Sequence, residues 1–408
     1  MAELSTSPPL TRASVQVAHE RIKSNIHHTP VLTNATISQF ASTPQTANAL
    51  QGTEWQGEEP ANPKIWVLFK CENYQRIGAF KARGAFHALG RLIEVVGEDE
   101  VRRRGVVTHS SGNHAQALSL AAKTFDIPAH IVMPTISTPS KIAGTKSYGA
   151  NVIFSGSTSD EREAVVADVI AKTGAILVPP YDHPDIMLGQ GTLALELEQQ
   201  AEEILSDASK SAGKIGIRNN GASLDAVIAP CGGGGMLSGV ATALSGTGIT
   251  VFGAEPSFEG ADDARRGLLQ GSRIEKVKTL TIADGLRTPV GKIPWTVLSD
   301  KTKLHSMYSV TEDQIKKAMR LLLERAKIFV EPSSAVPLAV VLFNEDFRRL
   351  VAQEAGDKGW NIGVVLSGGN TTVDAIAKLY APEAEKLGER QEGKVGMNGE
   401  KVAENIAG

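Results

Sequence analysis

Lys81 is the residue whose surroundings best suit covalent chemistry. It lies in the segment "NYQRIGAFKARGAF", where Ile77, Phe80 and Ala82 indicate partial burial. Burial lowers the pKa of a lysine and makes its amine available for Schiff-base formation near neutral pH. A solvated helix lysine is the alternative, and the segment alone does not decide between the two.

Four consecutive glycines, Gly232 to Gly235, follow the apolar run "AVIAP" and precede "MLSGVATAL". Unobstructed N–H groups at a strand-to-helix junction favour a phosphate site over a merely flexible turn. Two nucleotide motifs fail, since Leu237 and Ser238 stand where GxGxxG needs its third glycine, and no lysine follows Gly239. A Schiff-base lysine and a phosphate cradle together are what pyridoxal phosphate requires.

Two further loops carry polar side chains in the same strand-to-helix setting. "THSSGNHAQALSLA" places Ser110, Ser111 and Asn113 before an alanine-rich segment, either as helix caps or as ligand-binding groups. Ser367 in "VVLSGGN" is either a turn serine or a partner for a pyridine nitrogen. A hydroxyl would not hold a full pyridinium, so the ring would withdraw electrons weakly and favour β-elimination over transamination.

The elements that must position these loops alternate along the chain. Apolar strands and helices follow one another over residues 105–134, 224–256 and 361–379, with helices also expected from about 191 to 206 and over 312–343, the latter broken at Glu331–Pro332. This alternation predicts an α/β fold with parallel sheets covered by helices on both faces. In such sheets, ligands bind beyond the carboxyl ends of the strands, where the SSGNH, GGGG and LSGGN loops would all lie.

The bulk composition excludes several classes of partner. The 408 residues are 41% hydrophobic and 21% charged with a net charge of −3, so wholesale nucleic-acid binding is not expected. No apolar run of about 18 residues predicts a membrane span, and the first residues show no secretory signal. Cys71 and Cys231 form no CxxC pair and the histidines show no metal-ligand spacing, so a reduced, cytoplasmic setting is expected.

Taken together, the motifs resemble the fold-type II pyridoxal-phosphate enzymes, and most closely the serine racemase and serine/threonine dehydratase family. The resemblance runs from about Val15 to Leu379. It is carried, in order, by "HTPVLTN", "FKCENYQRIGAFKARGA", "VVTHSSGNHAQAL", "GQGTLALE", "APCGGGGMLSG", "GAEPS", "TIADGL" and "VLSGGN".

The resemblance implies a two-domain fold like that of the tryptophan synthase β chain. A large cofactor-binding domain would comprise residues 1–95 and 184–380, and a small domain with the SSGNH loop residues 96–183. Residues 42–63 would be an insertion and 381–408 a polar tail. A small amino-acid substrate, no nucleic-acid or membrane partner, and a homodimer are expected.

The resemblance also implies roles for individual residues. Lys81 would carry the cofactor, Phe80 would pack beside its ring, Asn113 would bond the ring hydroxyl and Ser367 would meet the ring nitrogen. The phosphate would be held by Gly232, Gly233, Gly234, Gly235 and Met236. The substrate would be bound by Ser110, Ser111, Gly112, Asn113 and His114, with Tyr148 and Arg162 nearby. A divalent ion, Mg²⁺ or Ca²⁺, would be held by Glu255, the Ala261 carbonyl and Asp263.

The implied mechanism gives the two faces of the substrate to different residues. Lys81 would remove the Cα proton of an L-amino acid, and Ser111 could deliver a proton from the opposite face and so invert the centre. Alternatively the β-hydroxyl leaves, and a 2-oxo acid and ammonia result. We therefore expect racemisation, dehydration or both for serine, threonine or 3-hydroxyaspartate.

Three alternatives remain open. Tyr181 in "PPYDHPD" stands where mammalian-type racemases have asparagine, in a version more like the dehydratases, so a threonine-specific dehydratase without racemase activity is one of them. A β-replacement enzyme of the cysteine synthase type is the second. A regulatory protein whose glycines hold a nucleotide phosphate is the third.

Overall fold

The computed structural model describes residues 4–110, 112–156, 158–207 and 223–381. The chain divides into two compact units, Met1–Asn370 and Thr371–Gly408. Within the second unit, helix α17 (Val373–Tyr380) begins where the Thr372 side chain accepts a hydrogen bond from the Ala375 N–H. The tail expected over 381–408 lies, apart from Ala381, outside the described residues.

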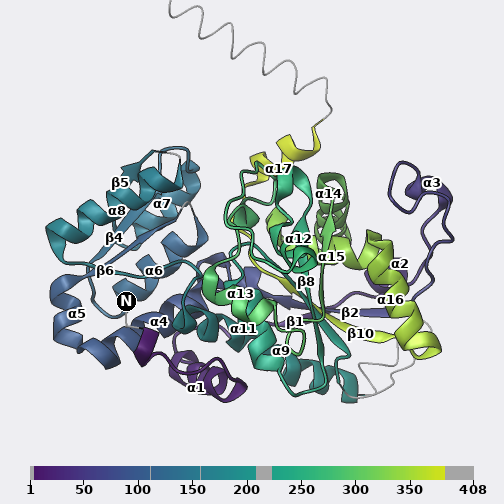
Figure 1. Cartoon of the computed structure of the whole chain (residues 1–408), viewed down its shortest axis with the longest axis horizontal. Helices are drawn as coiled ribbons and strands as arrows, with labels where there is room; N and C mark the ends of the chain where they lie inside the picture. Colours follow the sequence, from purple (N-terminus) through teal and green to yellow (C-terminus); the bar gives the residue numbers. More distant parts are fainter. Residues whose placement is uncertain (1–3, 111, 157, 208–222, 382–408) are drawn as a thin grey trace, which may run out of the picture. The chain divides into compact units, whose positions relative to one another are not determined.

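The larger sheet of the first unit has strand order β1-β2-β10-β7-β8-β9 (Figure 1). Neighbouring strands are parallel, except that β1 runs antiparallel to β2. Its strands are β1 (Val31–Thr33), β2 (Ile65–Cys71), β7 (Ala226–Pro230), β8 (Thr250–Pro256), β9 (Ser306–Val310) and β10 (Trp360–Leu366). The parallel α/β architecture predicted from the alternation of elements is confirmed.

The smaller sheet is entirely parallel, in the order β5-β4-β3-β6. Its strands are β3 (Val106–His109), β4 (Ala129–Pro134), β5 (Asn151–Ser155) and β6 (Ile176–Leu177). Strand β6 is shorter than the apolar run "AILVPPY" suggests, because Pro179 and Pro180 have no N–H to donate to a sheet ladder.

Helices connect the strands and cover the sheets (Figure 1). The described helices are α1 (Arg12–Ile22), α2 (Ala35–Ala41), α3 (Ala47–Leu50), α4 (Lys81–Val96), α5 (Glu98–Arg104), α6 (Asn113–Thr124), α7 (Pro139–Ser147), α8 (Ser159–Thr173), α9 (Pro184–Ser206), α11 (Gly235–Leu244), α12 (Asp263–Gln270), α13 (Lys292–Leu298), α14 (Glu312–Leu321), α15 (Pro332–Phe343), α16 (Glu345–Ala355) and, in the second unit, α17.

Two helices differ from the sequence-based expectation. Helix α9 begins at Pro184 rather than near residue 191, because the His183 side chain accepts a hydrogen bond from the Asp185 N–H and Pro184 suits a first turn. Helix α14 ends at Leu321 instead of continuing to Glu331. A wider turn over Leu322–Ala326 follows it, and Lys327, with φ of 61°, ends the helical run.

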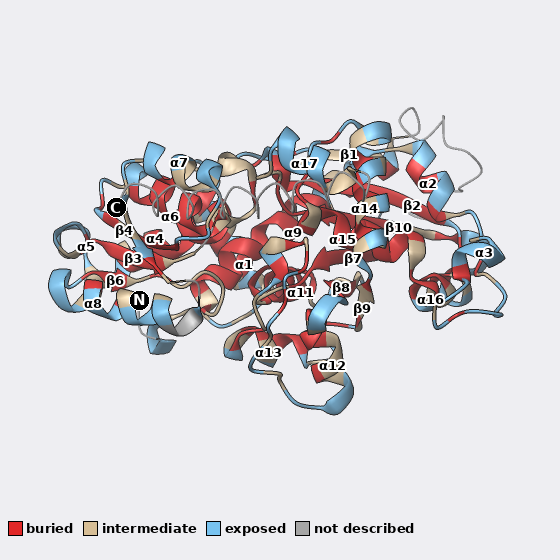
Figure 2. Ribbon diagram, turned by 90° about the horizontal axis from the view of Figure 1, so that it is seen from above, coloured by how far each residue is buried: buried red, intermediate tan, exposed pale blue. Residues whose placement is uncertain are grey.

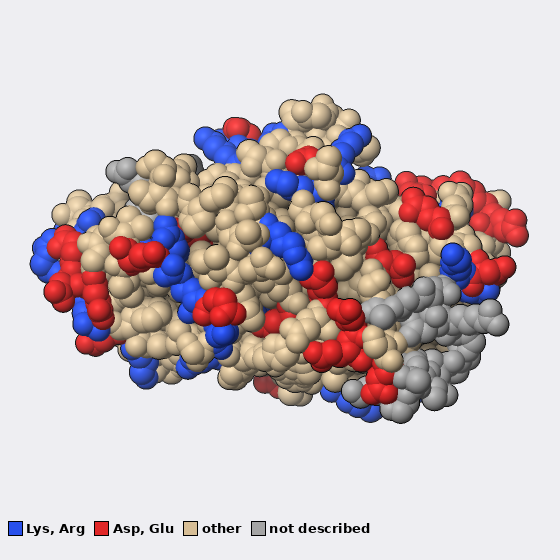
Figure 3. Space-filling model, turned by 90° about the horizontal axis from the view of Figure 1, so that it is seen from below, with Lys and Arg blue, Asp and Glu red and all other residues tan. Residues whose placement is uncertain are grey.

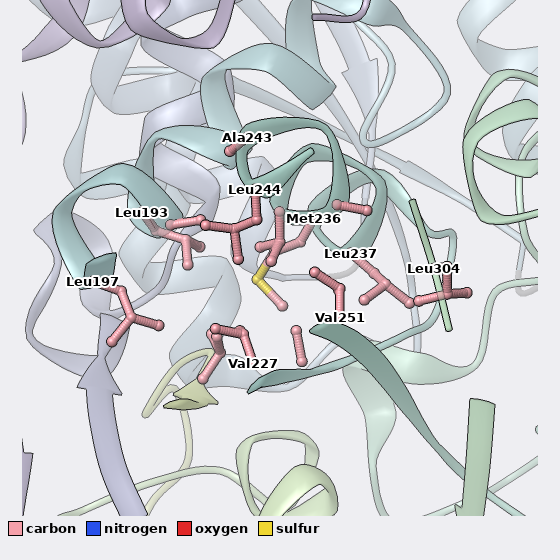
Figure 4. Close-up of a cluster of buried hydrophobic side chains, with 14 of the residues drawn as sticks. Leu193, Leu197, Val227, Met236, Leu237, Ala243, Leu244, Val251 and Leu304 are labelled. Carbon is pink, nitrogen blue, oxygen red and sulfur yellow. The ribbon is translucent and has the colours of Figure 1, made fainter. Parts of the chain in front are cut away.

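The hydrophobic core lies on both faces of each sheet (Figure 2). In β7, Val227 belongs to a cluster formed with α9 and α11, whereas the intervening Ile228 faces the opposite side. Figure 4 shows Leu193 of α9 beside Leu244 of α11, and Leu237 of α11 beside Val251 of β8. Each such side chain contributes about 1.5–3 kcal/mol on full burial, and this packing holds α11 against the carboxyl end of β7.

The surface carries charges of both signs. Lys and Arg lie among Asp and Glu on the face shown in Figure 3. Among the described helices, none is long and apolar enough to cross a bilayer.

Candidate active site

Lys81 is the first residue of α4, directly after a tightly bent segment. Ile77 has a φ of 61° and Gly78 one of 71°, both left-handed. The Phe80 N–H donates to the Ser367 carbonyl over 3.0 Å, and the Gly369 N–H donates to the Gly78 carbonyl over 2.9 Å. The bend therefore ties the loop that carries Lys81 to the loop that follows β10.

The Lys81 amine is half-buried, and among the residues that the structure describes it has one hydrogen-bond acceptor. Its Nζ donates to the Pro180 carbonyl over 2.8 Å and lies 5.1 Å from the centre of the Phe80 ring. Burial lowers the pKa of Lys81 to about 8. An amine of this pKa has a substantial neutral fraction near pH 7.5, as a nucleophile or a proton acceptor requires.

The glycine loop lies between the end of β7 and the start of α11. A Cβ on Gly233 would come within 2.6 Å of Cδ1 of Tyr181, the residue that follows Pro180. Gly234 adopts a left-handed φ of 82°, which favours glycine. The N–H groups of Gly232, Gly233 and Gly234 donate to no group in the described parts of the chain. Free N–H groups at the N-terminus of a buried helix fit a phosphate group.

Met236 contributes to this loop through its backbone alone. Its side chain is buried and belongs to the hydrophobic cluster of α9, α11, β7 and β8. Figure 4 shows the thioether among the cluster's aliphatic side chains. A contact from Met236 to a phosphate would therefore be made by its N–H.

Asn113 and Ser367 reach the Lys81 loop from different elements. The Asn370 Nδ2 donates to Asn113 Oδ1 and to the Ile77 carbonyl, each over 2.8 Å. Asn113 Nδ2 in turn donates to Glu331 Oε1 over 2.9 Å. Ser367 is buried, and its Oγ lies 3.1 Å from Ser334 Oγ. The structure thus brings four of the predicted cofactor-binding groups together: Lys81, the glycine loop, Asn113 and Ser367.

The SSGNH loop leads into α6. Ser110 Oγ accepts a hydrogen bond from the Gly112 N–H over 3.3 Å, and the helix begins at Asn113. A Cβ on Gly112 would lie 2.8 Å from Cδ of Lys141, so the end of that lysine side chain lies close against this loop. The positive end of α6 faces this loop and suits a carboxylate. Ser111, predicted as the second base, lies outside the described residues.

The His114 side chain is buried beneath the same helix start. Its Nε2 lies 3.3 Å from the Val178 carbonyl, so Nε2 carries the proton, and Nδ1 has no partner among the described groups. Burial, with a contribution from the charge of Lys81, lowers the pKa of His114 to about 3. The neutral imidazole therefore packs inside the protein and links the start of α6 to Val178. A contact between His114 and the substrate would be made by its backbone N–H.

Tyr148 and Arg162, expected near the substrate, lie in the part of the chain that forms the smaller sheet. Tyr148 follows α7 and packs against the hydrophobic cluster of α4 and α6. Arg162 lies in α8, where its charge lowers the pKa of His109, second to the effect of burial. Their predicted substrate contacts stay predictions.

A family model described as pyridoxal-phosphate dependent enzyme matches residues 56–368. The chain belongs to this family. It is 38% identical to serine racemase from Arabidopsis thaliana over 89% of this chain and 94% of that protein, and 34% identical to L-threo-3-hydroxyaspartate ammonia-lyase from Saccharomyces cerevisiae over 91% and 96%. The solved structure of maize serine racemase has a TM-score of 0.73 and 34% identity, and the match covers 94% of this chain and 99% of that one.

Membership of the pyridoxal-phosphate family confirms the cofactor predicted from Lys81 and the glycine loop. The residues in the structure fit that group on three counts. The amine has a lowered pKa, three loop N–H groups lack partners within the described chain, and a buried hydroxyl lies beside the lysine loop. The fold of the family, with its parallel sheets, is likewise confirmed.

The predicted metal ligands lie next to the glycine loop. Glu255, at the end of β8, accepts the N–H groups of Ala264 (3.0 Å) and Arg265 (2.9 Å), and Asp263 accepts that of Val290 (3.0 Å). Burial and the nearby charge of Asp263 raise the pKa of Glu255 well above its usual range, and burial raises that of Asp263 to about 6.

These ligands fit a cation only in part. Two buried carboxyls with raised pKa values and oxygen donors suit Mg²⁺ or Ca²⁺. However, no group of three or more His, Cys, Asp or Glu side chains positioned for a metal occurs in the described part of the chain. The third predicted ligand, the carbonyl of the buried Ala261, is a backbone group.

Three charged residues of this site were missed by sequence reasoning. Glu331 is 2% exposed, and its Oε2 has no partner among the described atoms. Burial, with the charge of Asp284, raises the pKa of Glu331 to about 7, although Lys141 opposes the shift. Lys141 forms an ion pair with Asp284. From the sequence Glu331 marked only a helix break, yet an acid directly after the apolar run "IFV" was a signal of a buried carboxyl.

Proposed function

We propose that this chain is a pyridoxal-phosphate enzyme that racemises and dehydrates small β-hydroxy amino acids such as serine, threonine or 3-hydroxyaspartate. The observation that carries the proposal is the half-buried Lys81 amine, which has a pKa of about 8 and donates to the Pro180 carbonyl. Backbone hydrogen bonds of Phe80 and Gly78 join its loop to that of Ser367, and Tyr181, next to Pro180, packs against the glycine loop. The relatives named above are a serine racemase and a hydroxyaspartate ammonia-lyase.

The residues that would hold the cofactor come from four segments. Lys81 would bind it covalently, the N–H groups of Gly232–Met236 would hold its phosphate, and Phe80 would pack on the ring. Asn113 would donate to the ring hydroxyl and Ser367 would meet the ring nitrogen. When bound, the cofactor withdraws electrons from the substrate Cα and so acidifies the hydrogen there.

The chain's own groups bind the substrate and move its protons. Ser110 and the N–H groups at the start of α6, that of Asn113 included, would bind the substrate carboxylate. Lys81 Nζ, once released, would take the Cα proton, and the Pro180 carbonyl would hold the resulting ammonium in place. Ser111 would return a proton on the opposite face, giving the enantiomer.

Dehydration would start from the same proton removal by Lys81. The C–O bond to the β-hydroxyl breaks, the hydroxyl leaves as water with one proton, and hydrolysis of the released enamine gives a 2-oxo acid and ammonia. Tyr148 and Arg162 would border the substrate.

The proposal is tested on purified protein in two steps. Borohydride reduction should add the mass of reduced pyridoxal phosphate to the peptide that contains Lys81. Chiral analysis of products from L-serine, D-serine, L-threonine and L-threo-3-hydroxyaspartate should then show inversion, 2-oxo acid formation or both. Colourless protein with no mass change would overturn the proposal, and turnover only with sulfide and O-acetylserine would replace it with β-replacement.

Several finer features belong to the same proposal. A divalent cation would bind Glu255, Asp263 and the Ala261 carbonyl, and two copies of the chain would form a homodimer in the cytoplasm. The two sheets support a large domain of residues 1–95 and 184–380 and a small one of 96–183. Light scattering on the eluting protein tests the dimer, and a fluorescent fusion tests the location.

A further inference from the structure

Two segments that are distant in the sequence pack against the glycine loop. Tyr181 belongs to the first of them, since a Cβ on Gly233 would come within 2.4 Å of Tyr181 Cγ. The second is the first turn of α13, because a Cβ on Gly234 would come within 2.9 Å of Pro294 Cβ. The conformation of the loop therefore depends on these two segments as well as on its own glycines.

Gly291, which precedes α13, fixes the direction of one peptide group of the glycine loop. Its N–H donates to the Gly233 carbonyl over 3.1 Å. In a trans peptide the N–H points opposite to the preceding carbonyl, and no cis peptide bond occurs in the described parts of the chain. The Gly234 N–H therefore points away from Gly291, and no described group accepts it. It is one of the N–H groups expected to hold the phosphate.

The Asp182 carboxylate holds Gly291 and the start of α13 in place. Its Oδ2 accepts the Lys292 N–H over 3.0 Å, and its Oδ1 accepts the Ile293 N–H over 2.8 Å. A Cβ on Gly291 would come within 2.6 Å of Asp182 Cγ, so the carboxylate lies directly against that residue. Gly291 has no side chain with which to cap α13, and Asp182 satisfies the N–H groups that a capping side chain would otherwise satisfy.

Asp182 also belongs to the segment that contacts Lys81. The Pro180 carbonyl, two residues earlier, accepts Lys81 Nζ over 2.8 Å, and Tyr181 between them packs against Gly233. Three consecutive residues thus contact the lysine, the glycine loop and the helix that packs against that loop.

We propose that Asp182 is a positioning residue that orients the Gly234 N–H for the cofactor's phosphate by holding Gly291 on the Gly233 carbonyl. This inference rests on the proposed function, because it takes the glycine loop as the phosphate site. Asp182 therefore contributes to the affinity for the phosphate without touching it. Loss of its carboxylate would free Gly291 and let the peptide between Gly233 and Gly234 rotate.

The test compares pyridoxal phosphate with pyridoxal, which lacks the phosphate. Each is titrated into the full-length protein after the cofactor has been removed, and the absorbance of the Schiff base gives its Kd. Asp182→Ala should raise the Kd of pyridoxal phosphate about five- to tenfold and leave that of pyridoxal unchanged. An unchanged Kd for pyridoxal phosphate, or an equal rise for both compounds, would overturn the proposal.

Two further variants separate this role from a merely structural one. Asp182→Asn keeps an oxygen that can accept one of the two N–H groups, so its Kd for pyridoxal phosphate should lie between those of the wild type and Asp182→Ala. Thr311→Ala is the matched control, because Thr311 Oγ1 caps α14 by accepting the Gln314 N–H over 3.3 Å. It should leave both Kd values unchanged. A rise in Thr311→Ala as large as that in Asp182→Ala would contradict the proposal.

The holoenzyme gives a second readout. The ³¹P resonance of the bound cofactor should move in Asp182→Ala toward that of free pyridoxal phosphate, and a resonance at the wild-type position would contradict the proposal. Failure of the proposed function is distinguishable. If the wild type binds pyridoxal phosphate no more tightly than pyridoxal, the glycine loop does not hold the phosphate and both proposals fail. If the wild type prefers pyridoxal phosphate and Asp182→Ala keeps the full preference, the role of Asp182 alone is wrong.

Discussion

Two clusters of polar and charged groups, each built around a buried glutamate, differ in how completely hydrogen bonds satisfy that glutamate. In the first, the Arg83 guanidinium donates to both oxygens of Glu72 (2.7 and 2.8 Å) and both oxygens of Glu196 (2.8 and 2.7 Å), and Lys70 donates to Glu196 over 2.7 Å. The second consists of Asn113, Lys141, Asp284 and Glu331. There, Glu331 Oε2 has no described partner.

The pKa values of the two buried glutamates diverge accordingly. Hydrogen bonds from His19 and Arg83 hold the pKa of Glu196 far below its usual range despite burial. Burial and the charge of Asp284 raise that of Glu331 to about 7. A saturated cluster fixes α4 to α9 and β2, whereas an unsaturated one retains capacity for a ligand or a proton. Both glutamates are buried, so burial alone does not distinguish a structural carboxylate from one in the candidate active site. The number of hydrogen bonds that each carboxylate accepts does distinguish them.

The largest expected effect concerns Lys81, which lies two residues before Arg83 on α4. Lys81→Ala removes both the covalent anchor and the proton acceptor, so kcat should fall by about 10⁴-fold. Initial rates of 2-oxo acid formation from L-serine measure the loss. Retention of most of the activity would show that another residue removes the proton.

Lys81→Ala also tests whether Lys81, unlike Arg83, contributes nothing to the stability of the fold. The Lys81 amine has a single described acceptor, and burying it lowers its pKa. Its removal should therefore leave the urea midpoint of the cofactor-free protein unchanged or slightly higher. A clear loss of stability would mean that Lys81 belongs to the scaffold as Arg83 does.

Arg83→Ala should have the opposite profile. Removing the guanidinium leaves two buried carboxylates without their main cation, which costs about 3–5 kcal/mol of unfolding free energy. Urea unfolding of the cofactor-free protein measures the loss. Exposed Arg103, paired with Glu100 on the surface, provides the matched control, since Arg103→Ala should change stability by less than about 1 kcal/mol.

The sequence predicts the loops of the candidate site better than it predicts the buried polar pairs behind them. The SSGNH, GGGG and LSGGN loops are short local patterns at strand ends, and the structure brings Asn113, the glycines and Ser367 to the Lys81 loop as expected. The polar partners behind them come from distant elements. Glu331 meets Asn113 across 218 residues, and Arg83 meets Glu196 across 113. No local periodicity encodes such pairs.

The ends of helices also depend partly on features that the local sequence pattern does not show. Helix α14 ends at Leu321 although its apolar periodicity continues, because the following turn closes through a hydrogen bond from the Ile328 N–H to the Leu322 carbonyl. This hydrogen bond depends on the left-handed backbone conformation of Lys327, and a lysine in the sequence does not predict that conformation. The alternation of strands and helices, by contrast, depends on side-chain patterning, and it predicts the parallel sheets correctly.

The raised pKa of Glu331 makes a pH-dependent prediction. A carboxyl whose pKa rises from 4.5 to about 7 on folding keeps its proton in the folded state, so its full contribution to stability exists below about pH 4.5 and is lost as pH rises through 7. The loss is at most about 3 kcal/mol. Glu331→Gln, which carries no titrating proton, should unfold with less pH dependence between pH 5 and 8.

Urea unfolding of the cofactor-free wild type and Glu331→Gln at pH 5 and pH 8 measures this difference. Glu196 serves as the comparison, because its lowered pKa gives stability that is present above the unfolded value and lost only as pH falls. Titration of Glu196 therefore adds nothing to the slope above pH 6. Identical slopes for the wild type and Glu331→Gln would show that Glu331 is ionised at pH 5, as a saturated carboxylate would be.

Glu255 and Asp263 form a third buried acidic group, and it tests the comparison with the smallest expected effect. Unlike Glu196, neither carboxylate has a lysine or arginine donor among the described residues, and backbone N–H groups donate to both. A divalent cation would supply the missing charge, and at a concentration one hundred times its Kd it should stabilise the protein by about 2.7 kcal/mol.

Thermal unfolding with Mg²⁺, Ca²⁺ or EDTA measures this shift. Asp263→Asn should remove the response, whereas Asp300→Asn, at an exposed acid, should retain it. An equal shift in both variants would mean that the cation acts elsewhere, and that backbone donors alone keep this acidic pair buried.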